Sequence, residues 1–335
     1  MRTFEYTRAD ALETAVALLQ GDPSAAPLGG GTTLIDLMKC GVADPSRLVD
    51  LTWIPGHDAV EADASALRIG ALCRMSDVAA HPEVRRRWPA ISRALLLGAS
   101  QQLRNMATIG GNLMQRTRCG YFRDPSFTEC NKRDPGSGCA AMHGENRGHA
   151  VLGTSEHCIA TYPGDLAVAL TALDAVVHLL GPDGSRTLPV DAFFLLPGET
   201  PQHEHPLRPA ELITAVEVPA SACAARSSYL KVRDRVSYEF AAASAAVGLE
   251  VRPDGCIADA RVALGGVATK PWRERDVEAA LTGRPASAAV FREAAELAAA
   301  DARPRRHNAY KVELARRTVE RALLTLSATR EDEER

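Results

Sequence analysis

Apolar positions near the N-terminus follow helical spacing and then change to the spacing of strands. In TRADALETAVALLQGD, Leu12, Val16 and Leu19 share one helical face. This pattern predicts a first helix with Thr7 as its N-cap and Asp10 in the capping-box position. The run AAPLGGGTTLIDLMKCG predicts a short strand, a glycine turn and the start of a helix, and SRLVDLT and ALRIGALC predict strands. The chain therefore opens as a mixture of helices and strands.

Regular periodicity is interrupted in the middle of the chain. VRRRWPAISRALLLGASQQLRNM predicts helix as far as Met106, with Pro89 near a break. Residues 115–160 have no clean period, and a loop of that length inside a compact domain is usually functional or disordered. TYPGDLAVALTALDAVVHLLGPDGSRTLPVDAFF then predicts a helix from about Asp165, a strand, a turn and a second strand. The pattern thus predicts a long irregular insertion.

The last third of the chain has its own pattern. We expect a boundary near Pro219–Ser228, followed by strands and a hairpin in SYLKVRDRVSYEFAAASAAVGLEVRPDGCIADARVALGGVA. Two helices, at about 276–302 and 308–327, are predicted to close the chain, and the final ATREDEER is expected to be frayed. We interpret RPRRHNAYK as a solvated helix start rather than an anion site.

Composition narrows the class of protein. The chain has 335 residues, is 46% hydrophobic and 24% charged, and has a net charge of −3. It lacks the basic bias of nucleic-acid binders, and an aromatic content of 5% argues against base stacking. No apolar run reaches the ~20 residues of a membrane span, and Glu5, Asp10 and Glu13 interrupt any signal-peptide core. We expect two or three subdomains and a cytoplasmic location, or a periplasmic one by co-export with a partner that carries the signal.

Two glycine turns are candidate phosphate-binding loops. In LGGGTTL, Gly29–Gly31 would let backbone N–H groups approach an anion closely. The turn is neither a Walker A loop nor a Rossmann fingerprint, because Leu34 stands where the last glycine would be. A second turn, ATIGGNL, spans residues 107–113. One such loop alone is more often only a turn, but two could hold the two phosphates of a dinucleotide.

Four of the eight cysteines fall in the irregular insertion, with the spacing C-x10-C-x8-C-x18-C. This matches neither a zinc finger nor the bacterial ferredoxin run. An iron–sulfur cluster, a structural zinc and disulfides therefore all remain open. Ligation by one of His143, His149 and His157 is a lesser alternative. The four residues are Cys119, Cys130, Cys139 and Cys158.

The neighbours of these cysteines and the remaining cysteines have simpler interpretations. Nearby basic residues are predicted to lower the thiol pKa values and to offset the charge of an all-thiolate cluster; they are Arg116, Arg118, Arg123, Lys132 and Arg133. The other cysteines are interpreted as small buried apolar residues; they are Cys40, Cys73, Cys223 and Cys256.

The chain resembles the flavin subunit of the molybdenum hydroxylases, the xanthine dehydrogenase and carbon monoxide dehydrogenase family. Nearly the whole chain carries the resemblance, in the family's order. The motifs are LGGGTTLIDLMK, RIGALCRMSDV, QLRNMATIGGNL, YPGDLAVALTALDA, ELITAVEVP, YLKVRDRVSYEFA, LGGVATKPWR and NAYKVELARRTVERAL. QRTRCGYFRD and the cysteine insertion resemble the subgroup with an extra [4Fe–4S] cluster. NRGHAVLGTSEHCIATYPGD is similar to the three-subunit molybdenum aldehyde oxidoreductase, more than to 4-hydroxybenzoyl-CoA reductase.

The resemblance implies an α+β fold. It consists of a vanillyl-alcohol-oxidase (PCMH)-type FAD-binding fold in two subdomains, plus a C-terminal α+β domain of the CO dehydrogenase flavoprotein type. The expected divisions are 1–55 for the first FAD-binding subdomain, 56–220 for the second with the insertion at about 115–160, and 225–328 for the C-terminal domain.

The resemblance also implies site residues. The FAD pyrophosphate would be wrapped by Leu28, Gly29, Gly30, Gly31, Thr32, Thr33 and Leu34. A second contact loop would be formed by Thr108, Gly111 and Asn112. Asp165 would bind ribityl or ribose hydroxyls, Ile213 would pack on the isoalloxazine ring, and Lys231 would lie near the polar edge of that ring. Alternatively, Asp165 is only a helix cap, Lys231 an ordinary surface residue and Ile213 plain core. The [4Fe–4S] ligands would be Cys119, Cys130, Cys139 and Cys158.

The implied activity is electron transfer. A partner with a molybdenum cofactor would oxidise an aldehyde to a carboxylic acid, and electrons would pass through [2Fe–2S] clusters of a small subunit to FAD here. No catalytic side chain is expected, since FAD carries the redox chemistry. Without an NAD fingerprint, the expected acceptor is oxygen, a quinone-linked carrier or a ferredoxin. The alternatives are a 4-hydroxybenzoyl-CoA reductase-like subunit, a stand-alone flavin oxidase and a zinc-stapled assembly protein.

Overall fold

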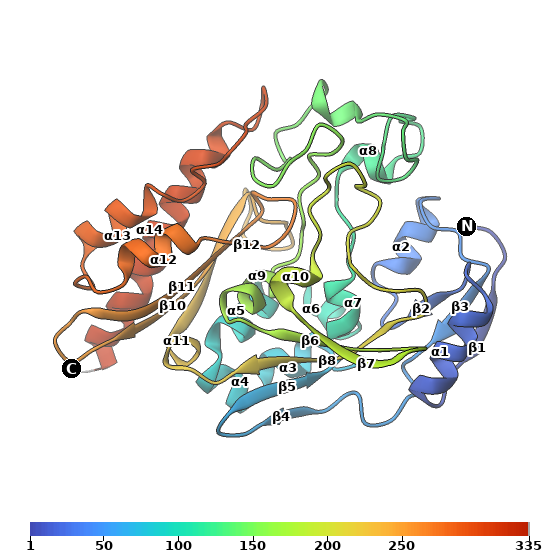
Figure 1. The fold of residues 1–335 in the computed structure, drawn as a ribbon, viewed down its shortest axis with the longest axis horizontal. Helices are drawn as coiled ribbons and strands as arrows, with labels where there is room; N and C mark the ends of the chain where they lie inside the picture. The colour runs from blue at the N-terminus through green and yellow to red at the C-terminus, as the bar shows by residue number, and fades with distance from the viewer. Residues whose placement is uncertain (334–335) are drawn as a thin grey trace.

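The computed structural model describes residues 1–333, which form three separate β-sheets (Figure 1). The first sheet is parallel, in the order β1-β3-β2. Its elements are β1 (Glu5–Arg8), α1 (Leu12–Gly21), β2 (Ala26–Leu28), α2 (Leu34–Lys39) and β3 (Arg47–Asp50). Val16 and Leu19 of α1 are buried with Val49 of β3, so the periodic apolar positions form this small core.

The second sheet is antiparallel, in the order β4-β5-β8-β6-β7. Its strands are β4 (Val60–Ala62), β5 (Ala66–Gly70), β6 (Val176–Gly181), β7 (Gly184–Pro189) and β8 (Leu212–Pro219). Its helices are α3 (Met75–Ala80), α4 (Pro82–Arg87), α5 (Pro89–Leu97), α6 (Gln101–Arg104), α7 (Ile109–Leu113), α9 (Leu166–Ala172) and α10 (Val190–Phe193). β8 is last in sequence but central in the sheet, and its isoleucine and valine residues are buried.

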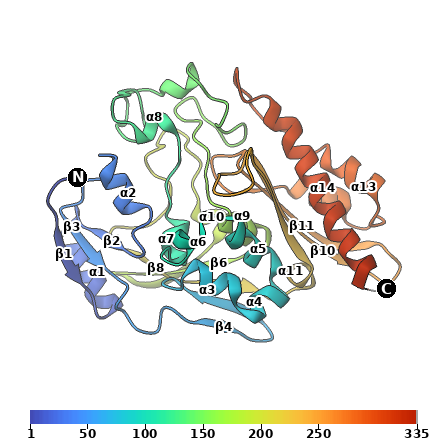
Figure 2. The same ribbon diagram turned by 180° about the vertical axis from the view of Figure 1, so that it is seen from behind.

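The third sheet is antiparallel, in the order β12-β11-β10-β9. Its elements are α11 (Ala222–Ala225), β9 (Ser227–Val232), β10 (Ala243–Val251), β11 (Ile257–Gly265), β12 (Trp272–Arg273), α12 (Arg275–Leu281), α13 (Ala288–Ala295) and α14 (Tyr310–Glu333). α14 lies on one side of β10, and α5 and α9 lie on the other (Figures 1 and 2). This explains why β10 is rich in small residues and buried on both faces.

The irregular insertion lies between the first sheet and the C-terminal helices, at the top of both views (Figures 1 and 2). Its only helices within residues 115–160 are α8 (Gly120–Arg123) and the 3-10 helix η1 (Ala140–Met142). Asn308, just before α14, donates its amide to the carbonyls of His149 and Ala150. The insertion is thus tied to the C-terminal domain.

Several predicted elements differ from the structure. Thr7 lies in β1 rather than capping a helix, and α1 begins after Ala11 without a side-chain cap. The helix predicted up to Met106 is three helices, because Pro89 starts a new one and a turn at Gly98–Ser100 ends it. The helix at 276–302 is also divided, into α12 and α13.

The end of the chain also differs from prediction. α14 continues to Glu333, so most of ATREDEER is helical rather than frayed, and residues 334–335 lie outside the described part. RPRRHNAYK is not a solvated helix start throughout, because Asn308 and Lys311 are almost completely buried. No helix of the described residues is both long and apolar enough to cross a membrane.

Candidate functional site

The two glycine loops pack directly against each other. A Cβ at Gly30 would lie 1.8 Å from the carbonyl oxygen of Met106, and one at Gly29 would lie 2.6 Å from Oγ1 of Thr108. Gly31 has a φ of +73°, in the left-handed region that favours glycine. Glycine at position 30 is therefore required by close approach to another backbone segment, and the positive φ falls one residue later.

The paired loops separate two cavities that meet at their tips. The smaller cavity has a volume of about 250 Å³ and the larger one about 690 Å³. Both are lined by Thr32, Thr33 and Gly111. A long ligand lying across the loops would thus place its middle at these backbone N–H groups and hydroxyls, with one end in each cavity.

The smaller cavity is mainly apolar. Ile213, which is 8% exposed, lies in its wall near the glycine loop. Leu37, Leu51 and Met114 line it as well. Its charged lining residues, Arg116 and Glu211, are each paired with another side chain, Glu204 and Arg186 respectively. This cavity suits a planar, uncharged ring.

The larger cavity contains a buried ion pair. Lys231 Nζ donates to Oδ2 of Asp165 at 2.7 Å, and Tyr229 donates its hydroxyl to Oδ1 at 2.6 Å. Burial raises the pKa of Asp165, while Lys231 and Tyr229 oppose that rise. Asp165 makes no capping bond to α9, and the side chain of Lys231 is 1% exposed. Neither residue therefore fits the simpler interpretation as helix cap or surface lysine.

Asn112 offers an unused acceptor in the same cavity. Its Nδ2 donates to Sδ of Met75, but its buried Oδ1 has no hydrogen-bond partner. An unpaired buried oxygen of this kind costs roughly 1–3 kcal/mol. A bound ligand that donates a hydrogen bond would remove this cost, so the residues present fit a dinucleotide.

The structure gathers almost all of the predicted FAD residues. Of the thirteen predicted from the resemblance, every one except Leu28 lines one of the two cavities. Leu28 is the last residue of β2. Ile213 and Lys231 border different cavities, however, so they lie toward opposite ends of the groove.

The four clustered cysteines surround one small cavity in the insertion. Cys130 and Cys139 face each other in an isolated antiparallel bridge, and all four thiols are free. Among the described residues, no three His, Cys, Asp or Glu side chains converge in the manner of single-ion ligands. The cysteines therefore border a shared space from separate sides. Gly136 and Gly138, at φ +90° and +103°, allow the backbone to turn sharply beside Cys139.

The predicted net lowering of the thiol pKa values by nearby basic residues is wrong for Cys119 and Cys158. Burial raises the pKa of Cys119 to about 12 and that of Cys158 to about 11, although Lys132 opposes the rise at Cys158. The basic side chains are engaged elsewhere: Arg118 and Arg123 pair with Asp36 of α2, and Arg116 and Lys132 pair with Glu204. Arg133 donates to the carbonyls of Tyr121 and Phe122.

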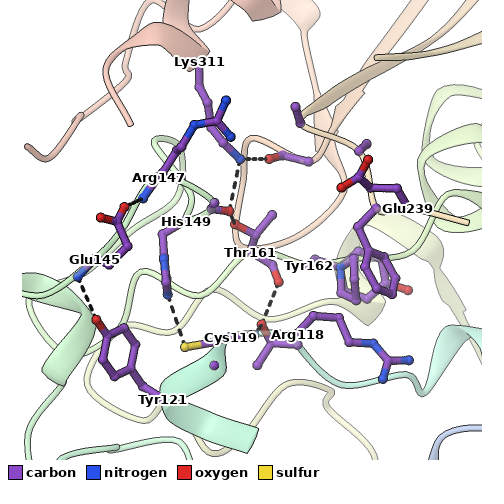
Figure 3. A pocket seen from close by; sticks show the side chains of 18 of the residues that line it. Arg118, Cys119, Tyr121, Glu145, Arg147, His149, Thr161, Tyr162, Glu239 and Lys311 are labelled. Atoms are coloured by element: carbon purple, nitrogen blue, oxygen red, sulfur yellow. Dashed lines mark hydrogen bonds between the residues drawn. The ribbon is translucent and has the colours of Figure 1, made fainter. Parts of the chain in front are cut away.

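Two further predictions about the cysteines and histidines need revision or refinement. Cys73 and Cys223 are buried as expected, but Cys40 and Cys256 are only half-buried. Among the three histidines, His149 lies against a cysteine, with Nε2 3.2 Å from Sγ of Cys119 (Figure 3). Burial lowers the pKa of His149 to about 4, so its ring is neutral near pH 7.

Sequence reasoning missed two residues that organise the site. Tyr229 stands two positions before Lys231 in β9, and strand alternation could have placed both on one face. The carboxylate of Glu204 forms ion pairs with both Lys132 and Arg116, which lie far from it in sequence. No local pattern in PQHEHPLRP could have indicated that role.

The chain matches two family models along most of its length. Residues 2–221 match the FAD binding domain in molybdopterin dehydrogenase, and residues 228–326 match the CO dehydrogenase flavoprotein C-terminal domain. The chain is 48% identical over 321 residues to the aldehyde oxidoreductase FAD-binding subunit PaoB of Escherichia coli (strain K12), covering 95% of this chain and 96% of that protein. It is 28% identical to the glyceraldehyde dehydrogenase medium chain of Sulfolobus acidocaldarius, covering 84% and 82%.

A solved structure gives the same result. A chain of the carbon monoxide dehydrogenase from Hydrogenophaga pseudoflava superposes with a TM-score of 0.75 at 28% identity, covering 98% of both chains. This confirms the α+β fold implied by the resemblance. The chain therefore belongs to the FAD-binding oxidoreductase subunits of the molybdenum hydroxylase family.

Proposed function

We propose that this chain is the electron-transferring FAD and [4Fe–4S] subunit of a three-subunit molybdenum aldehyde oxidoreductase that acts on aromatic aldehydes. Similarity to an aldehyde oxidoreductase FAD-binding subunit over 95% of the chain supports this proposal. Its partners would be a large subunit with the molybdenum cofactor and a small subunit with [2Fe–2S] clusters. The external acceptor would be oxygen, a quinone-linked carrier or a ferredoxin.

The residues of the groove would hold FAD in a single direction. Thr32, Thr33 and Gly111 would bind the pyrophosphate at the junction of the two cavities. The apolar wall at Ile213 suits the isoalloxazine ring, which leaves Asp165 and Lys231 to bind the adenosine ribose rather than the edge of that ring. FAD supplies the exchange between two-electron and one-electron carriers, and the chain supplies position and exclusion of water.

The gathering of four cysteines around one cavity supports a thiolate-bound centre. Zinc requires four ligands at about 2.0–2.3 Å from one atom. In a cubane cluster each thiolate binds a different iron, so the four sulfurs surround a volume instead of a point. The four cysteines border a shared cavity, and no three ligand side chains among the described residues converge on one position. His149 would then donate a hydrogen bond to the thiolate of Cys119 instead of replacing a ligand.

The sheets support the expected division of the chain. We place the subdomain boundaries at 1–55, 56–220 and 225–328, since each segment carries one complete sheet. The insertion at 115–160 interrupts the second segment and connects it to the other two through Asp36 and Asn308.

The observation that carries the proposal is the gathering of Cys119, Cys130, Cys139 and Cys158 around one cavity beside the FAD groove. Its test is a series of eight Cys→Ser variants, each purified with its partners. Iron, acid-labile sulfide and flavin would be measured per chain. We expect the wild type to hold four irons and four sulfides more than the [2Fe–2S] clusters of the partners supply, and only those four variants to lose this additional iron and sulfide.

The other four cysteines are the matched controls. The Cys73 and Cys223 variants show the effect of replacing a buried cysteine, and the Cys40 and Cys256 variants that of replacing a half-buried one. One zinc without sulfide beyond that of the partners' clusters, or iron loss in a different set of variants, would contradict the cluster. Absence of aldehyde oxidation in a wild-type complex that has its full iron content would instead contradict the assigned activity.

A further inference from the structure

A cavity of about 590 Å³ lies between the cysteine insertion and the C-terminal domain, outside the FAD groove (Figure 3). A volume of this size is typical of small-molecule sites. Its lining is concentrated in aromatic residues. The chain has seven Phe and six Tyr, thirteen in all, and five of these line this one cavity. They are Tyr121, Phe127, Tyr162, Phe240 and Tyr310.

A buried ammonium group lies at one end of the cavity. Lys311 of α14 is 1% exposed, and its Nζ donates to the carbonyl oxygens of Gly148 and Gly266 at 3.1 and 2.6 Å. A lysine has three donors, so one remains for another acceptor. No ion pair involves Lys311 within residues 1–333. Burial, with Arg147 nearby, lowers the pKa of Lys311 to about 8.

Arg147 adds a second positive charge at the same end (Figure 3). Its guanidinium lies 5.0 Å from the centre of the Tyr310 ring and 3.3 Å from the carboxylate of Asp234. That ion pair is largely exposed to solvent and therefore weak. Two cations held together repel each other, and an anion between them would remove the repulsion.

The acidic side chains of the cavity have partners of their own. Glu145 lies 3.5 Å from His307, Glu239 lies 4.0 Å from Arg235, and Asp234 pairs with Arg147. Arg118 pairs with Asp36, outside the cavity. Among the charged groups of the lining, the ammonium of Lys311 is thus the one without a carboxylate in the described residues.

We propose that this cavity binds a small aromatic carboxylate, with its carboxylate between Lys311 and Arg147 and its ring against the tyrosine and phenylalanine walls. The cations supply charge-assisted hydrogen bonds, and the aromatic walls supply apolar area. Under this proposal Lys311 is part of an anion site, whereas the sequence alone favoured a solvated helix start for RPRRHNAYK. The buried lysine and the aromatic residues come together only where the insertion packs against α14.

Two sources could supply such a ligand, and their identity rests on the proposed function. One is the aromatic acid formed by aldehyde oxidation. The other is a soluble aromatic acceptor that carries a carboxylate. The cavity borders Cys119 and shares Arg118, Glu239 and Phe240 with the larger half of the FAD groove. A ligand here would therefore lie beside both proposed redox centres.

The binding test uses the full chain with FAD and does not depend on turnover. Binding of benzoate, cyclohexanecarboxylate and benzyl alcohol to the protein would each be measured by calorimetry. Cyclohexanecarboxylate keeps the charge without the aromatic ring, and benzyl alcohol keeps the ring without the charge. We expect Arg147→Gln to weaken benzoate about tenfold, as loss of one charge-assisted hydrogen bond requires, and to leave benzyl alcohol unchanged. Arg147→Lys should restore part of the affinity.

Arg252→Gln is the matched control, because Arg252 is also an exposed arginine paired with an aspartate, Asp254, but lies elsewhere. Lys311→Met should abolish benzoate binding, with circular dichroism as a check that it folds. Absence of benzoate binding to the wild type would overturn the proposal. Equal affinity for benzoate and benzyl alcohol, or unchanged affinity in Arg147→Gln, would do the same.

The intact complex separates the two sources. If the product acid is the ligand, benzoate should slow aldehyde oxidation in the wild type but less so in Arg147→Gln. If an acceptor is the ligand, anthraquinone-2-carboxylate should be reduced to its hydroquinone by the two electrons and two protons that the aldehyde and water release. Its KM should then rise in Arg147→Gln. An inactive complex that still binds benzoate would contradict the proposed function and leave this site intact.

Discussion

The second glycine loop adjoins the cysteine insertion in sequence, but the paired loops and the insertion are stabilised in opposite ways. In the loops, backbone packs on backbone, with Gly30 against Met106 and no room for a Cβ. In the insertion, polar side chains replace regular structure. Oδ1 of Asn131 accepts from the N–H groups of Gly136 and Gly138, and Nδ2 of Asn131 donates to the carbonyl of His157.

This difference indicates how each region tolerates change. The loops pack through their glycines without room for a Cβ, so any side chain added at Gly29 or Gly30 must separate them. The buried apolar residues of the insertion pack mainly on other segments: Phe122 and Cys130 cluster with Leu37 of α2, and Val151 and Leu152 belong to the core of the C-terminal domain. The order of the insertion therefore depends on buried hydrogen bonds, ion pairs and, under our proposal, a cluster.

The largest effect is expected for Gly30→Val. The new side chain would overlap the carbonyl of Met106, so the loops must separate and the variant should lose about 4 kcal/mol or more of stability together with its FAD. Thermal unfolding and flavin content would measure this. Gly120→Ala in the insertion is the control, since a Cβ there meets no atom within 4 Å. Full FAD retention in Gly30→Val would show that the loops are not packed as described.

A smaller effect is expected for Glu204→Gln, which removes the charge that joins Lys132 and Arg116. Breaking such a pair leaves cations without a partner and should cost about 3 kcal/mol at pH 7. Burial alone would raise the pKa of Glu204, but Lys132 and Arg116 outweigh burial and lower it. The stabilisation is therefore present above the ordinary carboxyl pKa of 4.5 and is lost as the pH falls below it.

Limited proteolysis of the insertion, followed from pH 7 to pH 3, would measure the Glu204 effect. The wild type should become sensitive below pH 4.5, whereas Glu204→Gln should be sensitive throughout. Equal pH profiles for the two proteins would show that this ion pair does not hold the insertion.

The smallest effect is expected for Asn131→Ala. It removes three hydrogen bonds of a nearly buried amide and should cost about 2 kcal/mol, mostly within the insertion. Hydrogen exchange should rise at residues 130–140 with flavin content unchanged. Asn105→Ala, at an exposed position, is the control. Loss of FAD in Asn131→Ala would mean that loops and insertion form one cooperative unit.

The sequence by itself predicted many of the regular elements and the two glycine loops. Short apolar runs bounded by turn residues predicted β3, β5 and β6. All but one of the residues predicted from the motif order of the family line the groove. The prediction that Thr7 caps a helix is wrong because the spacing of a capping box does not exclude a strand. The strand β1, which contains Thr7, pairs with β3, and that pairing is not encoded in the local sequence.

The tertiary structure alone decided the partners of the charged groups. Arg116, Arg118, Arg123 and Lys132 are close to cysteines in sequence, yet their carboxylate partners, Asp36 and Glu204, come from distant segments. Lys311 looked solvated in a run of basic residues but lies buried against the insertion. Side-chain charge is local information, whereas burial and pairing depend on which segments the fold brings together, and no spacing along the chain records that.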